Sequence, residues 1–160
     1  MDDLETPRLL LHALTEEEAR TLHGGELLRG RRFDAGYPLP DTKDGLGFYL
    51  KHGTREFGFF LAVRRDDETV IGEIGFVGPP RDGAVTIGYA IVPSARRQGY
   101  VTEAIGAVAG WALERDDVGE VRAQTLHDNE PSVRALLRAG FTEIEPTEKV
   151  RRFVLTRPEG

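Results

Sequence analysis

A chain of 160 residues with 39% hydrophobic and 30% charged residues is expected to form a single globular domain over residues 1–160. The absence of cysteine excludes a disulfide scaffold, a thiolate metal site and a cysteine nucleophile, and the net charge of −6 argues against nucleic acid as a partner. No apolar run is long enough for a transmembrane helix, and the polar start MDDLETPRL is unlike a signal peptide, so we expect a cytoplasmic protein that contacts no membrane.

The first part of the chain predicts one strand and two helices. Thr15 and Glu18 have the spacing of a capping box, which marks a helix start, and the Gly24-Gly25 pair weakens the end of that helix. The expected elements are a strand at 6–13, a helix at 16–28, a basic turn at 29–33, a two-proline loop at 34–40, and a short helix from 41 or 42 to about 52. The basic turn is read as a solvated patch, with the mouth of a substrate or phosphate site as the alternative.

The remainder predicts a sheet interrupted by two helices. Runs of β-branched and aromatic residues separated by turn residues indicate an antiparallel meander. The expected elements are strands at 57–64, 69–77 and 84–91, a helix that ends before a turn at 116–119, a strand at 120–126, a helix from about 129 to 139, and a hairpin at 141–145 and 150–156. A helical crossover links 84–91 to 120–126, so these two strands should be parallel. Periodicity alone therefore predicts an α/β or α+β fold with a mixed sheet.

The stretch from 85 to 113 carries the strongest functional signal. A strand is followed by a short polar loop and then by a helix with apolar residues every three or four positions. The first amide groups of a helix have no intrahelical partner, and its dipole favours an anion there. Gly99 would let a phosphate approach the backbone, and Arg96 and Arg97 add positive charge. The alternative is a plain strand-to-helix turn with a solvated arginine pair.

This loop resembles the R/Q-x-x-G-x-G/A pyrophosphate loop of the GNAT superfamily of N-acetyltransferases. The residues that carry the resemblance are Arg96-Arg97-Gln98-Gly99-Tyr100-Val101, and Val101 departs from the Gly or Ala usual at the last position. The wider segment IGYAIVPSARRQGYVTEAI resembles the branch that contains the ribosomal-protein alanine acetyltransferases. The resemblance covers essentially the whole chain. It implies a central, mostly antiparallel sheet with a splayed parallel strand pair and about four helices.

The implied activity is transfer of the acetyl group of acetyl-CoA to a primary amine, either a peptide N-terminus or a small amine, by direct attack. The resemblance implies that the pantetheine arm pairs with free backbone groups near Ile91 and Val92. Asn129-Glu130-Pro131-Ser132 with the later Gly140-Phe141 resembles the family's N-x-x-S…G-F segment. Asn129 would then contact the coenzyme, and Ser132 would protonate the departing thiolate. Helix capping is the alternative role for both residues.

The base that accepts the proton of the amine is less clearly marked. Many relatives have a glutamate on the central strand where this chain has Thr86. Glu73, on the neighbouring strand, is our candidate base, acting directly or through water. His127, which follows the 120–126 strand, is a second candidate, since imidazole is a common general base. The alternatives are a solvent-facing strand residue for Glu73 and a solvated loop residue for His127.

In the resembled family, the early helical region forms one wall of the acceptor cleft. Tyr37, Phe48 and Tyr49 are therefore candidate acceptor-site residues, with core packing as the alternative. The four histidines show no metal-ligand spacing, so we expect no metal, and the protein should be a monomer or a homodimer. Two other functions stay open: a non-catalytic acyl-CoA-binding sensor or scaffold of the same fold, and a small interaction domain without coenzyme.

Overall fold

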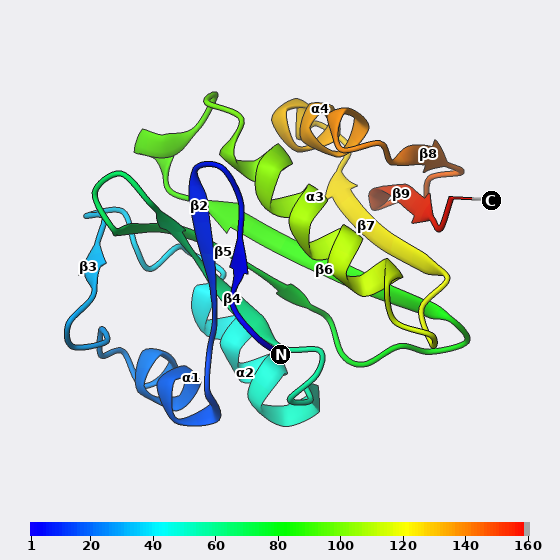
Figure 1. The fold of residues 1–160 in the computed structure, drawn as a ribbon. Coiled ribbons are helices and arrows are strands. Elements are labelled where there is room, and N and C mark those ends of the chain that lie inside the picture. Colours follow the sequence, from blue (N-terminus) through cyan, green and yellow to red (C-terminus); the bar gives the residue numbers. More distant parts are fainter. Residues whose placement is uncertain (159–160) are drawn as a thin grey trace.

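The computed structural model describes residues 1–158, which form one nine-stranded mixed sheet with helices on both of its faces (Figure 1). The helices are α1 (Glu16–His23), α2 (Thr42–His52), α3 (Tyr100–Leu113) and α4 (Glu130–Arg138), with a short 3-10 turn at Pro93–Ala95. The strands are β1 (Leu4–Glu5), β2 (Leu9–Ala13), β3 (Arg32–Phe33), β4 (Phe59–Arg64), β5 (Thr69–Phe76), β6 (Ala84–Ile91), β7 (Glu120–Leu126), β8 (Thr142–Ile144) and β9 (Val150–Thr156). Among the helices of these residues, none combines the length and the apolar character that a membrane span requires.

The sheet has the order β1-β2-β4-β5-β6-β7-β9-β8, and β3 pairs with β5 outside this path. Neighbours are antiparallel except for β6 with β7 and the short β3 with β5. The predicted sheet with a parallel 84–91/120–126 pair and four helices is therefore confirmed.

Side-chain alternation along β5 shows that the two helix pairs lie on opposite faces of the sheet. The side chain of Glu73 meets Thr42 of α2, whereas the next residue, Ile74, is paired with Tyr89, which meets Ser132 of α4. Successive side chains of a strand point to opposite faces. The face towards α1 and α2 is thus distinct from the face towards α3 and α4.

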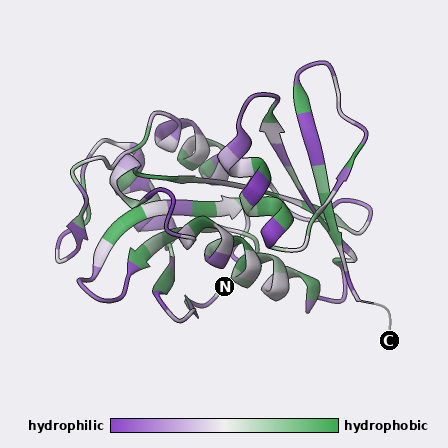
Figure 2. Ribbon diagram, turned by 90° about the horizontal axis from the view of Figure 1, so that it is seen from above, coloured by the Kyte–Doolittle hydropathy of each residue, from purple (hydrophilic) through white to green (hydrophobic). Residues whose placement is uncertain are grey.

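The core lies between the sheet and these helices, and Figure 2 shows hydrophobic residues running along the central strands while the loops are largely hydrophilic. Helix α3 buries small residues, so it can lie close to the sheet; these are Ala104, Ala109 and Ala112, with Ile105 and Val108 between them. Phe57, Phe76 and Trp111 form an aromatic cluster at one end, with ring centroids 5.3 to 5.6 Å apart.

Three predicted boundaries were wrong, each for a local reason. The strand expected at 6–13 begins only at Leu9, as β2, because Thr6 turns the chain between β1 and β2: its hydroxyl accepts from the Leu9 amide at 2.9 Å. Helix α1 ends at His23 rather than near Leu28, since Gly25 has a φ of +91° that ends the helical path. Within the predicted basic turn, Arg32 and Phe33 form β3 against β5.

The capping box of α1 yields a prediction on stability. The Thr15 hydroxyl accepts from the Glu18 amide at 3.1 Å, and the Glu18 carboxylate accepts from the Thr15 amide at 2.9 Å. Thr15→Ala should lower the free energy of unfolding by about 1 kcal/mol, measured by urea denaturation. Thr21→Ala on the same helix is the matched control and should be neutral or slightly stabilising, since alanine is the better helix former. Equal losses of unfolding free energy in the two variants would mean that the cap does not stabilise α1.

Candidate functional site

The site begins where β6 and β7 part. The two strands pair only over Ala84–Thr86 and Glu120–Arg122, although β6 remains paired with β5 as far as Ile91. The Thr86 carbonyl accepts from Val77 and the Val92 amide donates to the Ile71 carbonyl, so even-numbered residues of β6 bond towards β5. Backbone bonding alternates along a strand, so the groups of Ile87, Tyr89 and Ile91 face the opening.

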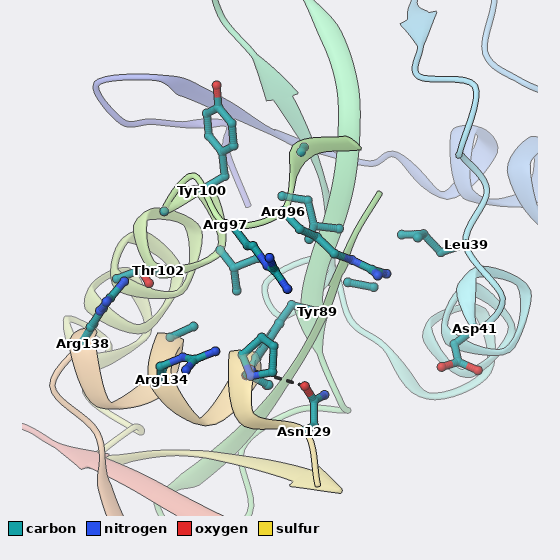
Figure 3. Close-up of a pocket in the computed structure, with 18 of the residues that line it drawn as sticks. Leu39, Asp41, Tyr89, Arg96, Arg97, Tyr100, Thr102, Asn129, Arg134 and Arg138 are labelled. Atoms are coloured by element: carbon teal, nitrogen blue, oxygen red, sulfur yellow. Dashed lines mark hydrogen bonds between the residues drawn. The ribbon is translucent and has the colours of Figure 1, made fainter. Parts of the chain in front are cut away.

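A cleft of about 840 Å³ lies at this end of β6 (Figure 3). Figure 3 shows Arg134 and Arg138 on one wall, Leu39 and Asp41 on the other, and Arg96 and Arg97 between them. The lining comes from the loop before α2, the end of β6, the loop into α3, and α4; its members are Leu39, Pro40, Asp41, Tyr89, Ala90, Ile91, Ala95, Arg96, Arg97, Gly99, Tyr100, Val101, Thr102, Asn129, Pro131, Ser132, Arg134, Ala135 and Arg138.

The loop into α3 presents a row of free amides. Arg97 and Gly99 have φ values of +65° and +82°, and the first helical bond runs from the Glu103 amide to the Gly99 carbonyl. Within residues 1–158, the amide N–H groups of residues 97 to 102 donate to no protein acceptor. The left-handed conformation at Gly99 favours glycine, which has no Cβ. Such a row of amides at a helix start can hold an anion.

The cleft is positively charged although the protein is acidic. Arg96, Arg97, Arg134 and Arg138 line it, against the single carboxylate of Asp41. None of the salt bridges in the described part of the chain involves these four arginines. Their charge is therefore available to a bound phosphate, for which arginine is a preferred partner.

Arg8, from the turn of the β1–β2 hairpin, braces the loop from behind. Its guanidinium donates to the Gln98 carbonyl at 2.7 Å and to the Glu103 carboxylate at 2.9 Å, and it lies 4.3 Å from the centroid of the Tyr100 ring. Burial pushes the pKa of Glu103 up, but donation from Thr6 and Arg8 outweighs it and holds the pKa below its usual range. Arg8 thereby fixes Gln98 before α3 and both Tyr100 and Glu103 in its first turn.

Three polar side chains meet where α4 begins. Asn129 is the N-cap of α4, and its side-chain oxygen accepts from the Ser132 amide at 3.4 Å. The Ser132 hydroxyl lies 2.6 Å from the Tyr89 hydroxyl. Burial raises the pKa of Tyr89, and the bond to Ser132 opposes this only in part, so the phenol is protonated at neutral pH. Asn129 and Ser132 are thus part of a cap and also line the cleft.

Glu73 is buried, but it lies outside the lining of the cleft. Its carboxylate accepts from the Thr42 hydroxyl at 2.7 Å, on the α2 side of the sheet. Burial raises the pKa of Glu73, and the bond from Thr42 opposes the shift without cancelling it. The structure therefore does not bring Glu73 and Ser132 together.

The structure also separates other predicted residues from the cleft. Val92 is fully buried with its amide bonded to Ile71, and Gln98 contributes its carbonyl to Arg8. His127 bonds the Thr147 carbonyl at 2.9 Å and is not part of the lining.

None of the three aromatic candidates for the acceptor site lines the cleft. Tyr37 is buried against Phe33, Phe48 stacks on His52, and Tyr49 borders a second, smaller hollow. The loop that carries Tyr37 does reach the cleft, through Leu39, Pro40 and Asp41. The role of this region in binding an acceptor stays a prediction.

Sequence reasoning missed Tyr89, Thr102, Arg134 and Arg138. A signal for the two arginines was present: Pro131, Arg134, Ala135 and Arg138 have the spacing of one helix face, adjacent to the buried Val133 and Leu136. Tyr89 gave no such signal, because its partner lies 43 residues away. Among residues 1–158, no group of three His, Cys, Asp or Glu side chains could hold a metal ion.

The parallel strand pair that parts beside a loop of free amides agrees with the fold that the resemblance to the GNAT acetyltransferases implies. Residues 8–142 match the family model described as an acetyltransferase (GNAT) domain, and the chain belongs to this family. It is 30% identical over 148 residues to the uncharacterized N-acetyltransferase YjdG of Bacillus subtilis, covering 86% of this chain and 88% of that protein.

Two solved structures show the same fold. One is the ribosomal-protein-S5-alanine acetyltransferase of Vibrio fischeri, with a TM-score of 0.69, 16% identity and 96% of each chain covered. The other is RimL, a ribosomal L7/L12 alpha-N-protein acetyltransferase in complex with coenzyme A, with a TM-score of 0.69, 19% identity and coverage of 94% of this chain and 95% of that one. The family match confirms the predicted family, and the two solved structures share its fold.

The burial of Glu73 predicts a specific dependence of stability on pH. Because its folded pKa is raised, its contribution to stability is full below the unfolded pKa and is lost as pH rises through the folded pKa. Glu73→Gln cannot ionise, so its free energy of unfolding relative to wild type should increase as the pH rises above about 4, the ordinary pKa of glutamate. Urea denaturation at several pH values measures this. Glu56→Gln, at an exposed carboxylate, controls for the change in net charge; the same trend in both variants would contradict the prediction.

Proposed function

We propose that the protein is an N-acetyltransferase that moves the acetyl group of acetyl-CoA to a primary amine by direct attack. The observation that carries the proposal is the row of free amides at residues 97 to 102, set among four unpaired arginines beside the parted strands. Amides and arginines together suit a pyrophosphate. The coenzyme A complex of RimL, which shares the fold, supports this choice of ligand.

In this proposal the loop of residues 96–101 holds the pyrophosphate, and Arg134 and Arg138 add charge from α4. The free backbone groups of Ile91 face the opening, so Ile91 rather than Val92 would pair with the pantetheine arm. Val101 departs from the small residue usual in the motif, but its amide is among the free ones. Asn129 would orient the coenzyme through its side-chain amide group, since its oxygen already serves the cap.

Acetyl-CoA would supply an activated acetyl group, and the protein would supply donors and proton carriers. A backbone N–H at the opening would stabilise the developing oxyanion. Ser132 would donate its hydroxyl proton to the departing sulfur. Glu73 would accept the proton of the amine through water, and its raised pKa makes it a stronger base than an ordinary glutamate carboxylate.

The acceptor would enter from the α2 side, past Leu39, Pro40 and Asp41. Asp41 would attract a cationic amine. A peptide N-terminus is the acceptor class that the ribosomal-protein acetyltransferase neighbours suggest, and a small amine is the alternative.

One observation favours a second function. The resembled family often has a glutamate where this chain has Thr86, and Glu73 lies outside the cleft lining. A non-catalytic sensor or scaffold that binds acyl-CoA would need the phosphate loop but no base.

Binding of acetyl-CoA tests the site that both functions share. Gly99→Asp places a carboxylate among the free amides and should weaken binding at least about tenfold by repelling the phosphates, as titration calorimetry would measure. Gly106→Asp adds the same charge at an exposed position of α3 and should bind as wild type does. Unchanged affinity in a folded Gly99→Asp variant would place the phosphates elsewhere.

Release of free thiol with a panel of amines and N-terminal peptides tests catalysis. Ser132→Ala should lower kcat by about 10²-fold or more with little change in acetyl-CoA affinity. Glu73→Gln should lower kcat/KM and remove the acidic limb of its pH profile, because the limb reflects protonation of the base. If the profile is unchanged, the amine loses its proton directly to water. Binding without thiol release for any amine would favour the sensor.

A further inference from the structure

We propose that Tyr89 is the positioning residue of the proton donor: it orients the Ser132 hydroxyl towards the departing sulfur and replaces the proton that Ser132 gives away. This inference rests on the proposed function and deepens its least defined step.

The geometry supports a directed pair. Tyr89 comes from β6 and Ser132 from the first turn of α4, and their hydroxyl oxygens are 2.6 Å apart, which is a short bond between two O–H groups. A serine hydroxyl has one hydrogen and two acceptor lone pairs. When the phenol donates to Ser132, the serine hydrogen is left to point elsewhere, and both residues line the cleft.

The acidities of the groups explain why a serine needs this partner. A thiol has a pKa of about 8.5 and a phenol of about 10, whereas an aliphatic hydroxyl does not titrate in the range of protein side chains. Ser132 alone would become an alkoxide, which is a far stronger base than the thiolate it protonates. With Tyr89 behind it, the charge ends on a phenolate, much closer in basicity to the thiolate. Because burial raises the pKa of Tyr89, the phenol also keeps its proton until it is needed.

The step balances in protons and electrons. The bond between the acyl carbon and the sulfur breaks, and its electron pair goes to the sulfur. The sulfur takes the proton of Ser132, and Ser132 takes the proton of Tyr89. The phenolate then takes a proton from water in the cleft, which offsets the proton that the amine has released. No redox partner is required.

The ionisation of bound free CoA tests the pair without any acceptor. CoA carrying ¹³C next to the sulfur reports the pKa of its thiol by NMR titration. A hydrogen bond to a charged group contributes about 1.5–3 kcal/mol, so Ser132→Ala should raise this pKa by about 1–2 units. Tyr89→Phe should raise it by part of that shift. In the Ser132→Ala background, Tyr89→Phe should add nothing, because its effect passes through Ser132.

The other ionisable groups of the cleft affect the thiol pKa equally in wild type and in the Tyr89→Phe variant. The ionisable groups that line the cleft are Asp41 from the loop before α2, Arg96, Arg97 and Tyr100 around the start of α3, and Arg134 and Arg138 on α4. All are unchanged in the Tyr89→Phe variant. Thr125→Val removes another buried hydroxyl, on β7 outside the lining, and should leave the pKa of the bound thiol as it is in wild type.

Kinetics give a second readout. Tyr89→Phe should lower the rate of the first turnover by about tenfold or more, with less than about a twofold change in the KM for acetyl-CoA. A fluorinated tyrosine at position 89, which keeps the hydroxyl but has a lower phenol pKa, should restore the rate and move its alkaline limb to lower pH. A purely structural role for Tyr89 would not move that limb.

The outcomes separate this inference from the function on which it rests. A protein that binds no CoA overturns both. If CoA binds, a thiol pKa that does not shift in the Tyr89→Phe variant overturns the inference but leaves the proposed function standing. The same holds if Tyr89→Phe shifts the thiol pKa equally in wild type and in the Ser132→Ala background. The expected shift together with no transfer to any amine would support the pair and overturn only the proposed catalysis.

Discussion

The site depends on the interruption of one strand pairing. Strand β6 pairs with β7 only over Ala84–Thr86, and from Ile87 to Ile91 it pairs with β5 alone. An unpaired strand edge inside a protein would normally cost free energy, because buried amides and carbonyls need partners. Here the edge faces a cleft into which the starts of α3 and α4 also project. The fold therefore gathers unused donors from the edge of β6, the start of α3 and the start of α4 in one cleft. An extended, multiply charged ligand with an amide-containing arm requires such a set of donors.

Electrostatics within the cleft differ from those of the whole molecule. The chain has a net charge of −6, yet four arginines line the cleft and none of them is paired with a carboxylate among residues 1–158. Other arginines, such as Arg64 and Arg151, are held by Asp67 and Glu143. The charge of an unpaired arginine is available to a ligand, whereas the charge of an arginine in a salt bridge is largely compensated by its carboxylate. The net charge of the chain therefore does not indicate the sign of the charge in this cleft.

The parts of the fold that follow from local chemistry could be predicted. The strand–loop–helix around Gly99 and the cap at Asn129 depend on residues close in sequence, and the parallel pair follows from the helical crossover between its two strands. All three occur as expected. The composition of the cleft depends on contacts between distant segments, and it was predicted only in part. Tyr89 looked like an ordinary strand residue until α4 placed Ser132 beside it. Glu73 was chosen because it lies on the strand next to β6, but strand alternation turns it to the other face of the sheet. Sequence spacing cannot report which face of a sheet a neighbouring strand presents unless the register is known.

The bracing of the loop by Arg8 links ligand binding to the far edge of the sheet. Arg8 belongs to the hairpin of β1 and β2, which lies at the edge of the sheet. Its guanidinium donates hydrogen bonds to the Gln98 carbonyl and to the Glu103 carboxylate. Edge hairpins open more readily than central strands, and any opening here releases the loop. Coupling of this kind is reciprocal, so a ligand on the loop must stabilise the hairpin by as much as the intact hairpin strengthens binding. The local unfolding of one edge of the sheet is in this way a second equilibrium that sets the apparent affinity of the cleft.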